Sequence, residues 1–329
     1  MVLAAGLGTR LRPLTYEVTK PMVPVLDRPV MEHILDLLDR HSFGPVIANL
    51  HYFAQTIREH FGERISYRYE PELLGTAGGV RGCADFFGGA SFLVISGDAL
   101  TDIDLRRFAE RHRQAGGIAT LAVKRVPDTR EYGVVLHDRE GRVTGFQEKP
   151  APEEALSELG NCGIYMFEPE IFDYFPERPF VDWAQDVFPT LLEHDVPFHI
   201  HALHAYWNDV GSLGELRRGT FDALAEVLAD RLGEIVEVGD HRPERVPVEQ
   251  IKDVLHHRPV EHRHHRLSDL IGERAQPRAE ARGENHRSHR RKSGPLVAVV
   301  IGLVGAIHGH ADVRRLLLAQ PREPDAERV

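Results

Sequence analysis

The sequence predicts an α/β protein with a doubly wound, mostly parallel sheet and helices on both faces. Up to about residue 225, short apolar runs rich in β-branched residues alternate with amphipathic stretches of helical period, a pattern typical of βαβ units. The chain has 329 residues, of which 42% are hydrophobic and 27% charged, the composition of a folded globular protein. In doubly wound sheets ligands bind at the carboxyl ends of the strands, so chemistry is expected in the loops that follow them.

The predicted strands are short apolar runs bounded by turn residues. They are Val2–Ala5, Val46–Leu50, Ile65–Glu70, Phe92–Ser96, Thr120–Val126, Gly133–His137, Gly163–Phe167 and Phe198–Leu203. Helices are predicted between them. Pro29 suits a first helical position, because apolar residues then recur at helical spacing. Asp104 is the predicted N-cap of a helix that begins at Leu105.

Charge and cysteine content exclude several classes of protein. The formal net charge of -10 argues against a general binder of nucleic acid or of an acidic membrane surface, so any anion site must be local. Cys83 and Cys162 have no metal-ligand spacing and cannot form a disulfide framework, which suits a reducing compartment. No signal peptide is expected, because a basic region followed by an apolar segment is not readable at the N-terminus. We therefore expect a cytoplasmic protein with neither a nucleic-acid nor a membrane partner.

The composition changes near the C-terminus. Phe221 is the last aromatic residue, and half of the 20 histidines follow it in runs such as "HHRPVEHRHHR". The predicted organisation is therefore a catalytic domain over residues 1–228 and a poorly ordered Arg/His-rich tail over residues 229–329. A shifted reading frame is the alternative explanation, and irregular His spacing disfavours a metal-binding tract. The apolar segment 296–307 falls short of the ~20 residues that span a bilayer and is predicted to be buried.

The stretch "GLGTRLRPLT" at 6–15 follows the first predicted strand. Glycines at that place let backbone N–H groups approach an anion closely, and Arg10, Arg12 and Lys20 add positive charge. The dinucleotide pattern G-x-G-x-x-G is not met, because Leu11 stands where the third glycine is required. A simple turn with solvated arginines is the alternative. The nearby cations and prolines favour a phosphate site.

Motifs in a fixed order carry a more specific resemblance. They are "LAAGLGTRLRPLT" with "KPMVPV" after it, then "EPELLGTAGGV", "ISGDALTDIDL", "YGVV", "FQEKP", "NCGIYMFEPEIF" and "WNDVGSLGEL", running from residue 3 to residue 216. In these motifs the chain resembles the sugar-1-phosphate nucleotidyltransferases, also called sugar-nucleotide pyrophosphorylases. The resemblance implies a Rossmann-like nucleotidyltransferase sheet. It also implies in-line attack of a sugar-1-phosphate on the α-phosphorus of a nucleoside triphosphate, with loss of pyrophosphate.

The resemblance also implies roles for residues in these motifs. The nucleotide-binding residues it implies are Leu3, Ala4, Ala5, Gly6, Gly8, Thr9, Gly75, Thr76 and Ala77. The catalytic residues it implies are Arg10, Lys20, Asp98 and Asp209. For the sugar phosphate it implies Gly133, Glu148, Lys149, Asn161 and Gly163.

Two aspartates are the implied ligands of the cofactor Mg²⁺. Asp98 follows the apolar run "FLVIS" and Gly97, which places a carboxylate at the carboxyl end of a central strand. Asp209 lies between Trp207 and Gly211. Mg²⁺ commonly takes one or two carboxylates together with phosphate oxygens and water. A lone aspartate after a strand is otherwise usually a helix cap or a turn residue.

The expected function is therefore the synthesis of a nucleoside-diphosphate sugar from a nucleoside triphosphate and a sugar-1-phosphate. "LGTAGG" and "YGVV" with "EKP" most resemble mannose-1-phosphate guanylyltransferases, so GTP and mannose-1-phosphate are the expected substrates. Glucose-1-phosphate thymidylyl- or uridylyltransferases are the alternatives. A regulatory paralogue that binds sugar nucleotides without turnover is a further one, disfavoured because the four implied catalytic residues are all present. A homo-oligomer is compatible with the sequence.

Overall fold

The computed structural model describes residues 1–236, with side chains described through residue 227. Tertiary contacts divide the chain into two units, Met1–Gly219 and Thr220–Val329. Every residue with an implied site role belongs to the first unit. The predicted tail lies outside the described residues from residue 237 onward, and so do its His-rich runs and the apolar segment 296–307.

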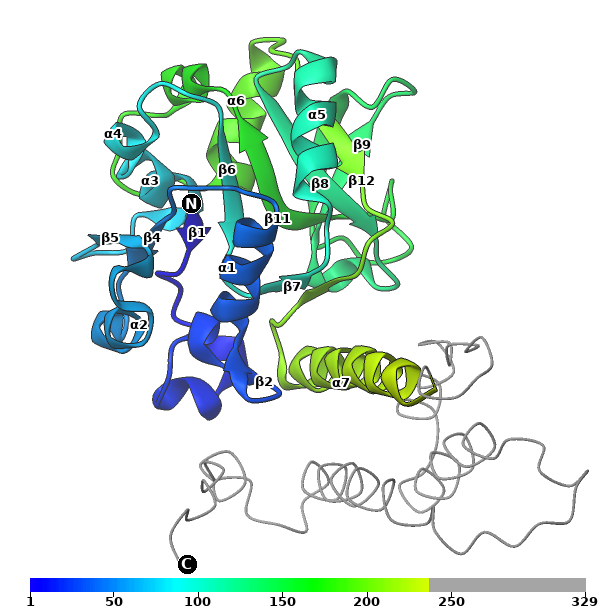
Figure 1. Ribbon diagram of the computed structural model, residues 1–329. Helices are drawn as coiled ribbons and strands as arrows, with labels where there is room; N and C mark the ends of the chain where they lie inside the picture. The colour runs from blue at the N-terminus through cyan, green and yellow to red at the C-terminus, as the bar shows by residue number, and fades with distance from the viewer. Residues whose placement is uncertain (237–329) are drawn as a thin grey trace, which may run out of the picture. The chain divides into compact units, whose positions relative to one another are not determined.

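The first unit is built on a nine-stranded sheet (Figure 1). Its strand order is β10-β9-β11-β6-β1-β4-β5, while β8 pairs with β11 and with β12. The strands are β1 Val2–Leu3, β4 Ile47–Leu50, β5 Ser66–Tyr69, β6 Phe92–Ser96, β8 Ala119–Arg125, β9 Gly133–His137, β10 Val143–Glu148, β11 Leu159–Phe167 and β12 His199–Ala202. Each predicted strand corresponds to one of these.

The direction of the strands confirms the predicted fold class. The pairs β1–β4, β1–β6, β4–β5 and β8–β12 are parallel. Strand β11 is antiparallel to β6, β8 and β9, and β10 is antiparallel to β9. Within this sheet, β11 and β10 therefore run against the direction that the other strands share. The carboxyl ends of β1, β4, β6 and β8 consequently meet at one edge, where a ligand site is expected.

Helices cover both faces of the sheet (Figure 1). The helices of the first unit are α1 Val30–Arg40, α2 Ala54–Phe61, α3 Gly75–Arg81, α4 Ala84–Phe87, α5 Leu105–Ala115 and α6 Phe188–Glu193, and a further helix, α7 Leu213–Val236, begins in the first unit and continues into the second. Successive side chains of β8 point to opposite faces of the sheet. Leu121 belongs to the hydrophobic core cluster that also contains residues of α6, whereas Thr120 contacts His112 of α5 on the other face. Asp104 caps α5 as predicted, since its carboxylate accepts the backbone N–H groups of Arg106 and Arg107.

Short elements complete the first unit. Two small antiparallel sheets pair β7 Ala99–Thr101 with β13 Trp207–Asp209, and β2 Pro24–Val25 with β3 Arg28–Pro29. The short 3₁₀ helices are η1 Thr9–Leu11, η2 Leu14–Tyr16, η3 Lys20–Met22, η4 Gly62–Arg64, η5 Thr129–Glu131 and η6 Pro169–Tyr174, and η7 Trp183–Val187 is a π-helix. Among the described residues, no helix combines the length and the apolar character that crossing a membrane requires.

Candidate functional site

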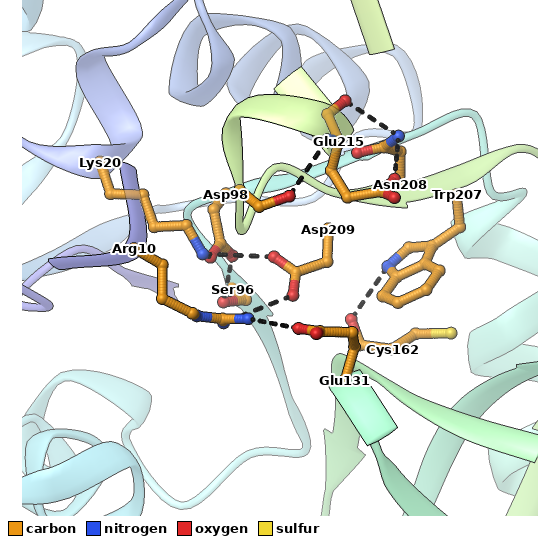
Figure 2. A network of polar contacts seen from close by, with 11 residues as sticks. Arg10, Lys20, Ser96, Asp98, Glu131, Cys162, Trp207, Asn208, Asp209 and Glu215 are labelled. Atoms are coloured by element: carbon orange, nitrogen blue, oxygen red, sulfur yellow. Dashed lines mark hydrogen bonds and ion pairs between the residues drawn. The ribbon is translucent and has the colours of Figure 1, made fainter. Parts of the chain in front are cut away.

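Lys20, Asp98 and Asp209 meet at the carboxyl edge of the sheet and form what we call the carboxylate cluster (Figure 2). Asp98 stands between β6 and β7. Asp209 pairs with Ala99 in the β7–β13 ladder, so the register of that ladder places the two aspartates side by side. The backbone N–H of Val210 donates to the carbonyl of Asp98 at 3.2 Å. Lys20 Nζ contacts Asp98 Oδ2 and lies 3.2 Å from Asp209 Oδ1.

The cluster is an electrostatically strained arrangement, because one ammonium faces two carboxylates. The three side chains are only 14%, 16% and 22% exposed. Burial opposes the charge of Lys20, yet the two carboxylates raise its pKa above the ordinary value. Burial also disfavours ionised Asp98, but Lys20 and the Ser96 hydroxyl, which donates to Asp98 Oδ1 at 2.5 Å, hold its pKa low. Burial and the neighbouring Asp98 raise the pKa of Asp209.

This donor set fits a divalent cation. The two carboxylates, 16% and 22% exposed, lie close enough to disfavour each other's charge, which the raised pKa of Asp209 expresses. Two carboxylates from separate loops are what Mg²⁺ commonly takes from a protein when phosphate oxygens and water complete its shell. The described residues contain no group of three or more His, Cys, Asp or Glu that could hold a metal ion by themselves. The assignment of Asp98 and Asp209 as Mg²⁺ ligands therefore stays a prediction.

The glycine loop after β1 packs directly against the cluster. Gly8 has a φ of +61°, and a Cβ there would lie 3.0 Å from both Lys20 Cβ and Thr15 Cγ2. The Thr15 hydroxyl donates to the Gly8 carbonyl at 2.7 Å, and the Leu11 N–H donates to it at 3.0 Å. A glycine is required here both for its backbone conformation and for this close approach. By contrast, a Cβ on Gly6 would have no neighbour within 4 Å.

Arg10 joins the loop to two carboxylates. Its Nη1 lies 3.3 Å from Glu131 Oε2, and its Nη2 lies 3.9 Å from Asp209 Oδ2 (Figure 2). Arg10 and Glu131 are both exposed by half or more, and exposed ion pairs of this kind contribute only about 0–1 kcal/mol. Arg10 can therefore leave Glu131 for a stronger anion at little cost. Arg12 points elsewhere, with its guanidinium over the Tyr16 ring.

The second predicted nucleotide loop, Gly75–Ala77, begins α3 and is held by another segment. The N–H groups of Ala77 and Gly78 donate to the carbonyl of Val181 at 3.0 and 2.9 Å. The Thr76 hydroxyl donates to Asp182 Oδ2 at 2.8 Å. Asp182 also caps η7, so this contact joins the loop to the N-terminus of that helix.

Two predicted sugar residues lie beside the carboxylate cluster. Strand β11 bulges between Asn161 and Tyr165 in its pairing with β8. A Cβ on Gly163, inside this bulge, would lie 3.1 Å from the Cβ of Ser96. Asn161 is held in place because its Oδ1 accepts the Gly163 N–H at 3.1 Å and its Nδ2 donates to the Tyr165 hydroxyl at 2.9 Å. In the β6–β11 pair, Ile164 stands opposite Ile95, and this register places Gly163 at the end of β6.

The other predicted sugar residues stand apart at the end of β10. Gly133 pairs with Glu148 in the β9–β10 ladder. Lys149 adopts a φ of 45°, and its Nζ lies 3.5 Å from Glu148 Oε1. The side chains of Glu148 and Lys149 are 57% and 51% exposed. We call these two residues the exposed edge, since they are open to solvent and interact mainly with each other.

Sequence reasoning missed several residues that organise the site. Ser96 hydrogen-bonds Asp98, Glu131 pairs with Arg10, and the Trp207 indole N–H donates to the Cys162 carbonyl at 3.1 Å. Asn208 Nδ2 donates to Glu215 Oε2 at 3.0 Å and ties β13 to the start of α7. Most of these residues lie inside the quoted motifs or directly beside them. Their position in a motif was the available signal, because their side-chain type alone indicates no chemistry.

Fold and site define a class of protein. Residues 1–226 match the model of the nucleotidyl transferase family, and the chain belongs to that family. The resemblance drawn from the motifs is thereby confirmed.

Curated relatives share this part of the chain. A UTP–glucose-1-phosphate uridylyltransferase of Synechocystis sp. is 41% identical over 232 residues, which cover 65% of this chain and 60% of the relative. A mannose-1-phosphate guanylyltransferase of Mycobacterium tuberculosis is 34% identical over 231 residues, covering 68% of this chain and 64% of the relative. The match therefore spans less than two thirds of the length of either relative.

Solved structures confirm the fold. A putative glucose-1-phosphate thymidylyltransferase from Bacillus anthracis matches with a TM-score of 0.61 at 24% identity, over 68% of this chain and 93% of that one. A UDP-glucose pyrophosphorylase in complex with UDP-glucose matches with a TM-score of 0.59 at 18% identity, over 68% of this chain and 97% of that one. At these identities the likeness concerns the architecture alone.

Proposed function

We propose that this chain transfers a nucleotidyl group from a nucleoside triphosphate to a sugar-1-phosphate and releases pyrophosphate. The observation that carries the proposal is the convergence of Arg10, Lys20, Asp98 and Asp209 at the carboxyl edge of a sheet whose sequence belongs to the nucleotidyl transferase family. Nucleotidyl transfer needs alignment of the reactants and neutralisation of phosphate charge rather than covalent participation of the protein.

In the proposed reaction an oxygen of the sugar-1-phosphate attacks the α-phosphorus in line. The bond between the α-phosphorus and the oxygen that bridges to the β-phosphate breaks, and pyrophosphate leaves with that electron pair. Gly6, Gly8 and Thr9 cradle the triphosphate with backbone N–H groups, while Arg10 and Lys20 neutralise charge that builds up during transfer. Asp98 and Asp209 would hold Mg²⁺, which supplies further neutralisation of the phosphate oxygens.

The sugar phosphate is assigned to the other side of the site. Lys149 offers an exposed ammonium for the phosphate, and Glu148 offers acceptors for sugar hydroxyls. Asn161 and Gly163 lie between that side and the carboxylate cluster, through the contact of Gly163 with Ser96. Because the side chain of Lys149 is 51% exposed and that of Lys20 only 14%, the two ammonium groups are suited to different tasks: reversible capture of a substrate and fixed stabilisation of the transition state.

Two substrate pairs are proposed. The 41% identical relative is a uridylyltransferase, which supports UTP with glucose-1-phosphate. The motifs "LGTAGG" and "EKP" together with the 34% identical guanylyltransferase support GTP with mannose-1-phosphate, the pair expected from the sequence. A non-catalytic sugar-nucleotide binder is the second class of function, and the presence of all four charged residues in one arrangement favours the enzyme over it.

The deciding experiment measures pyrophosphate release from ATP, GTP, CTP, UTP and dTTP, each with glucose-1-phosphate, mannose-1-phosphate and N-acetylglucosamine-1-phosphate in the presence of Mg²⁺. Product sugar nucleotides are identified by mass spectrometry. We expect one nucleotide to dominate and the product to contain both substrates. Nucleotide binding by calorimetry without pyrophosphate release from any pair would instead support the non-catalytic binder.

A further inference from the structure

Asn49 and Glu70 form a buried polar pair that the proposed reaction does not use. Asn49 lies in β4 and Glu70 directly follows β5, where its N–H donates to the Leu50 carbonyl at 2.8 Å. Their exposed fractions are 3% and 2%. A buried carboxylate needs hydrogen-bond donors to offset the loss of hydration, so its partners show what it does.

These partners connect the two predicted nucleotide loops. The Ala4 N–H donates to Asn49 Oδ1 at 2.9 Å, and Asn49 Nδ2 donates to Glu70 Oε1 at 2.8 Å. The Leu74 N–H in turn donates to Glu70 Oε2 at 3.2 Å. Ala4 belongs to the first predicted nucleotide loop, which runs from Leu3 to Thr9. Leu74 directly precedes Gly75, the first residue of the second loop. We call these three consecutive hydrogen bonds the Asn49–Glu70 relay.

Helix α3 packs directly onto the relay. A Cβ on Gly79 would lie 2.5 Å from Asn49 Nδ2 and 2.6 Å from Glu70 Oε1, closer than side-chain atoms tolerate. The glycine thus allows the helix that carries Gly75–Ala77 to rest on the same two side chains. The relay consequently fixes the end of β1 and the beginning of α3 against one another.

The direction of the hydrogen bonds dictates which residue can stand at position 70. Ala4 supplies a donor, which turns the oxygen of Asn49 toward it and leaves the amide NH₂ to face Glu70. Leu74 supplies another backbone donor on the far side. Position 70 must therefore accept twice, and an ionised carboxylate is a side chain with acceptors only. An amide there would turn an N–H toward another N–H, whichever way it is flipped.

We propose that Asn49 and Glu70 are positioning residues that set the spacing of the two nucleotide loops, and so the affinity for the nucleoside triphosphate. This inference rests on the proposed function, in which those loops bind the nucleotide. Asn49 and Glu70 act through the backbone of Ala4 and Leu74. Their loss should therefore weaken nucleotide binding while the sugar-phosphate side is unaffected.

The test uses two single variants and their combination. Glu70→Gln places two donors face to face, and Asn49→Asp places two carboxylates face to face. In the double variant all three hydrogen bonds can form again, because the carboxylate at position 49 accepts from the Ala4 N–H and from the amide at position 70, whose oxygen accepts from the Leu74 N–H. The double variant has the same net charge as the wild type and nearly the same shape. Rescue by it reports the hydrogen-bond pattern rather than volume.

A matched control removes a buried hydrogen bond from elsewhere in the sheet. Thr120 is fully buried in β8, and its hydroxyl lies 2.8 Å from His112 Nδ1. Thr120→Val should lower the melting temperature without changing nucleotide affinity. Each protein is measured by calorimetry with UTP and GTP, by steady-state kinetics in both substrates, and by hydrogen exchange at the Ala4 and Leu74 amides.

We expect each single variant to raise the Kd and the KM for the nucleotide roughly tenfold, the size expected when a buried donor or acceptor is left unpaired. The KM for the sugar-1-phosphate should change by less than about twofold. Exchange at Ala4 and Leu74 should accelerate, and the double variant should restore all three quantities. Unchanged exchange in Glu70→Gln, or a double variant no better than the singles, overturns the proposal.

Failure of the proposed function would look different. A wild type that binds no nucleotide overturns the assignment of the loops as a nucleotide site, whatever the relay does to amide exchange. If a single variant fails to fold, the double variant still decides. Retention of fold and nucleotide affinity in the double variant alone supports the relay, and unfolding of the double variant as well overturns it.

Discussion

The carboxylate cluster and the exposed edge differ in how their charges are held. In the cluster, Lys20, Asp98 and Asp209 are at most 22% exposed and are brought together by the β7–β13 ladder. At the exposed edge, Glu148 and Lys149 are more than half exposed at the end of β10 and interact mainly with each other. Both regions combine Lys with acidic residues, yet their surroundings are opposite.

This difference teaches which part of the site is formed before substrate arrives. Charges that are largely withdrawn from solvent are tolerated only with partners in fixed geometry, so we propose that the cluster is the part of the site that stabilises the transition state. Exposed charges cost little free energy of folding and keep their rotamer freedom, so we propose that the edge is the part that adapts to a substrate and releases it. We therefore expect changes in the cluster to reduce kcat and changes at the edge to raise KM.

The largest effect is expected from the aspartates of the cluster. Asp98→Ala and Asp209→Ala should each lower kcat by about a hundredfold or more, because transition-state charge stabilisation is removed. Steady-state rates at fixed Mg²⁺ measure this, and circular dichroism checks the fold. Asp104→Ala is the control, since this exposed cap should cost about 1 kcal/mol of stability without loss of turnover. Near-normal rates in both cluster variants would refute the two-aspartate assignment.

Arg10 shares a property with each region, since its side chain is exposed like those of the exposed edge but contacts Asp209 of the carboxylate cluster. Arg10→Ala should lower kcat by about a hundredfold while nucleotide affinity falls less than about tenfold, because its charge matters most during pyrophosphate departure. Calorimetric binding compared with turnover separates the two effects. Glu131→Gln is the matched control, because it removes the partner of Arg10 without removing the guanidinium. An unchanged kcat in Arg10→Ala would mean that the loop is a structural turn.

Within the glycine loop, Gly8 is closely packed against other side chains whereas Gly6 is open, so the two glycines can be compared in the same way. Gly8→Ala should weaken nucleotide binding and lower the melting temperature together, because its Cβ meets Lys20 and Thr15 at a positive φ. Gly6→Ala meets no protein atom, so it should keep the melting temperature and lose nucleotide affinity only if phosphates occupy the space beside it. Thermal unfolding with and without nucleotide distinguishes the two variants. Normal nucleotide binding by Gly6→Ala would remove Gly6 from the phosphate cradle.

At the exposed edge a smaller effect is expected. Lys149→Met should raise the KM for the sugar-1-phosphate by about tenfold, the loss of one charge-assisted contact, and leave the KM for the nucleotide unchanged. The melting temperature should stay within a degree or two, because an exposed Lys–Glu pair contributes about 0–1 kcal/mol. Arg139→Met, another exposed cation, serves as the comparison. An equal loss in both KM values would contradict the division between edge and cluster.

The smallest effect is expected from shortening the chain. All residues of the cluster, the exposed edge and the nucleotide loops lie within Met1–Gly219. A chain that ends after Val236 should therefore keep kcat and both KM values within about twofold, provided that it folds. Kinetics and light scattering of the shortened and full-length proteins make the comparison. Loss of activity would assign residues after 236 a part in folding or assembly.

Local patterns determined much of this protein in advance. Alternation of apolar runs and amphipathic stretches is a property of neighbouring residues, so it predicted the α/β class, the strands β6 and β9 to the residue, and the cap Asp104. The glycine loop and the aspartate after β6 were likewise visible, since they occupy positions where a strand ends. The motifs added Asp209, although no local rule distinguishes it from a turn residue.

Only the tertiary structure decided how these pieces meet. The pairing of Asp209 with Ala99, the β6–β11 register that places Gly163 against Ser96, and the contact of Arg10 with Glu131 join residues far apart in the chain. The reversed directions of β10 and β11 and the Asn49–Glu70 relay are of the same kind. Such contacts leave no periodicity in the sequence, because their free energy depends on register, burial and hydrogen-bond direction, which exist only once the chain has folded.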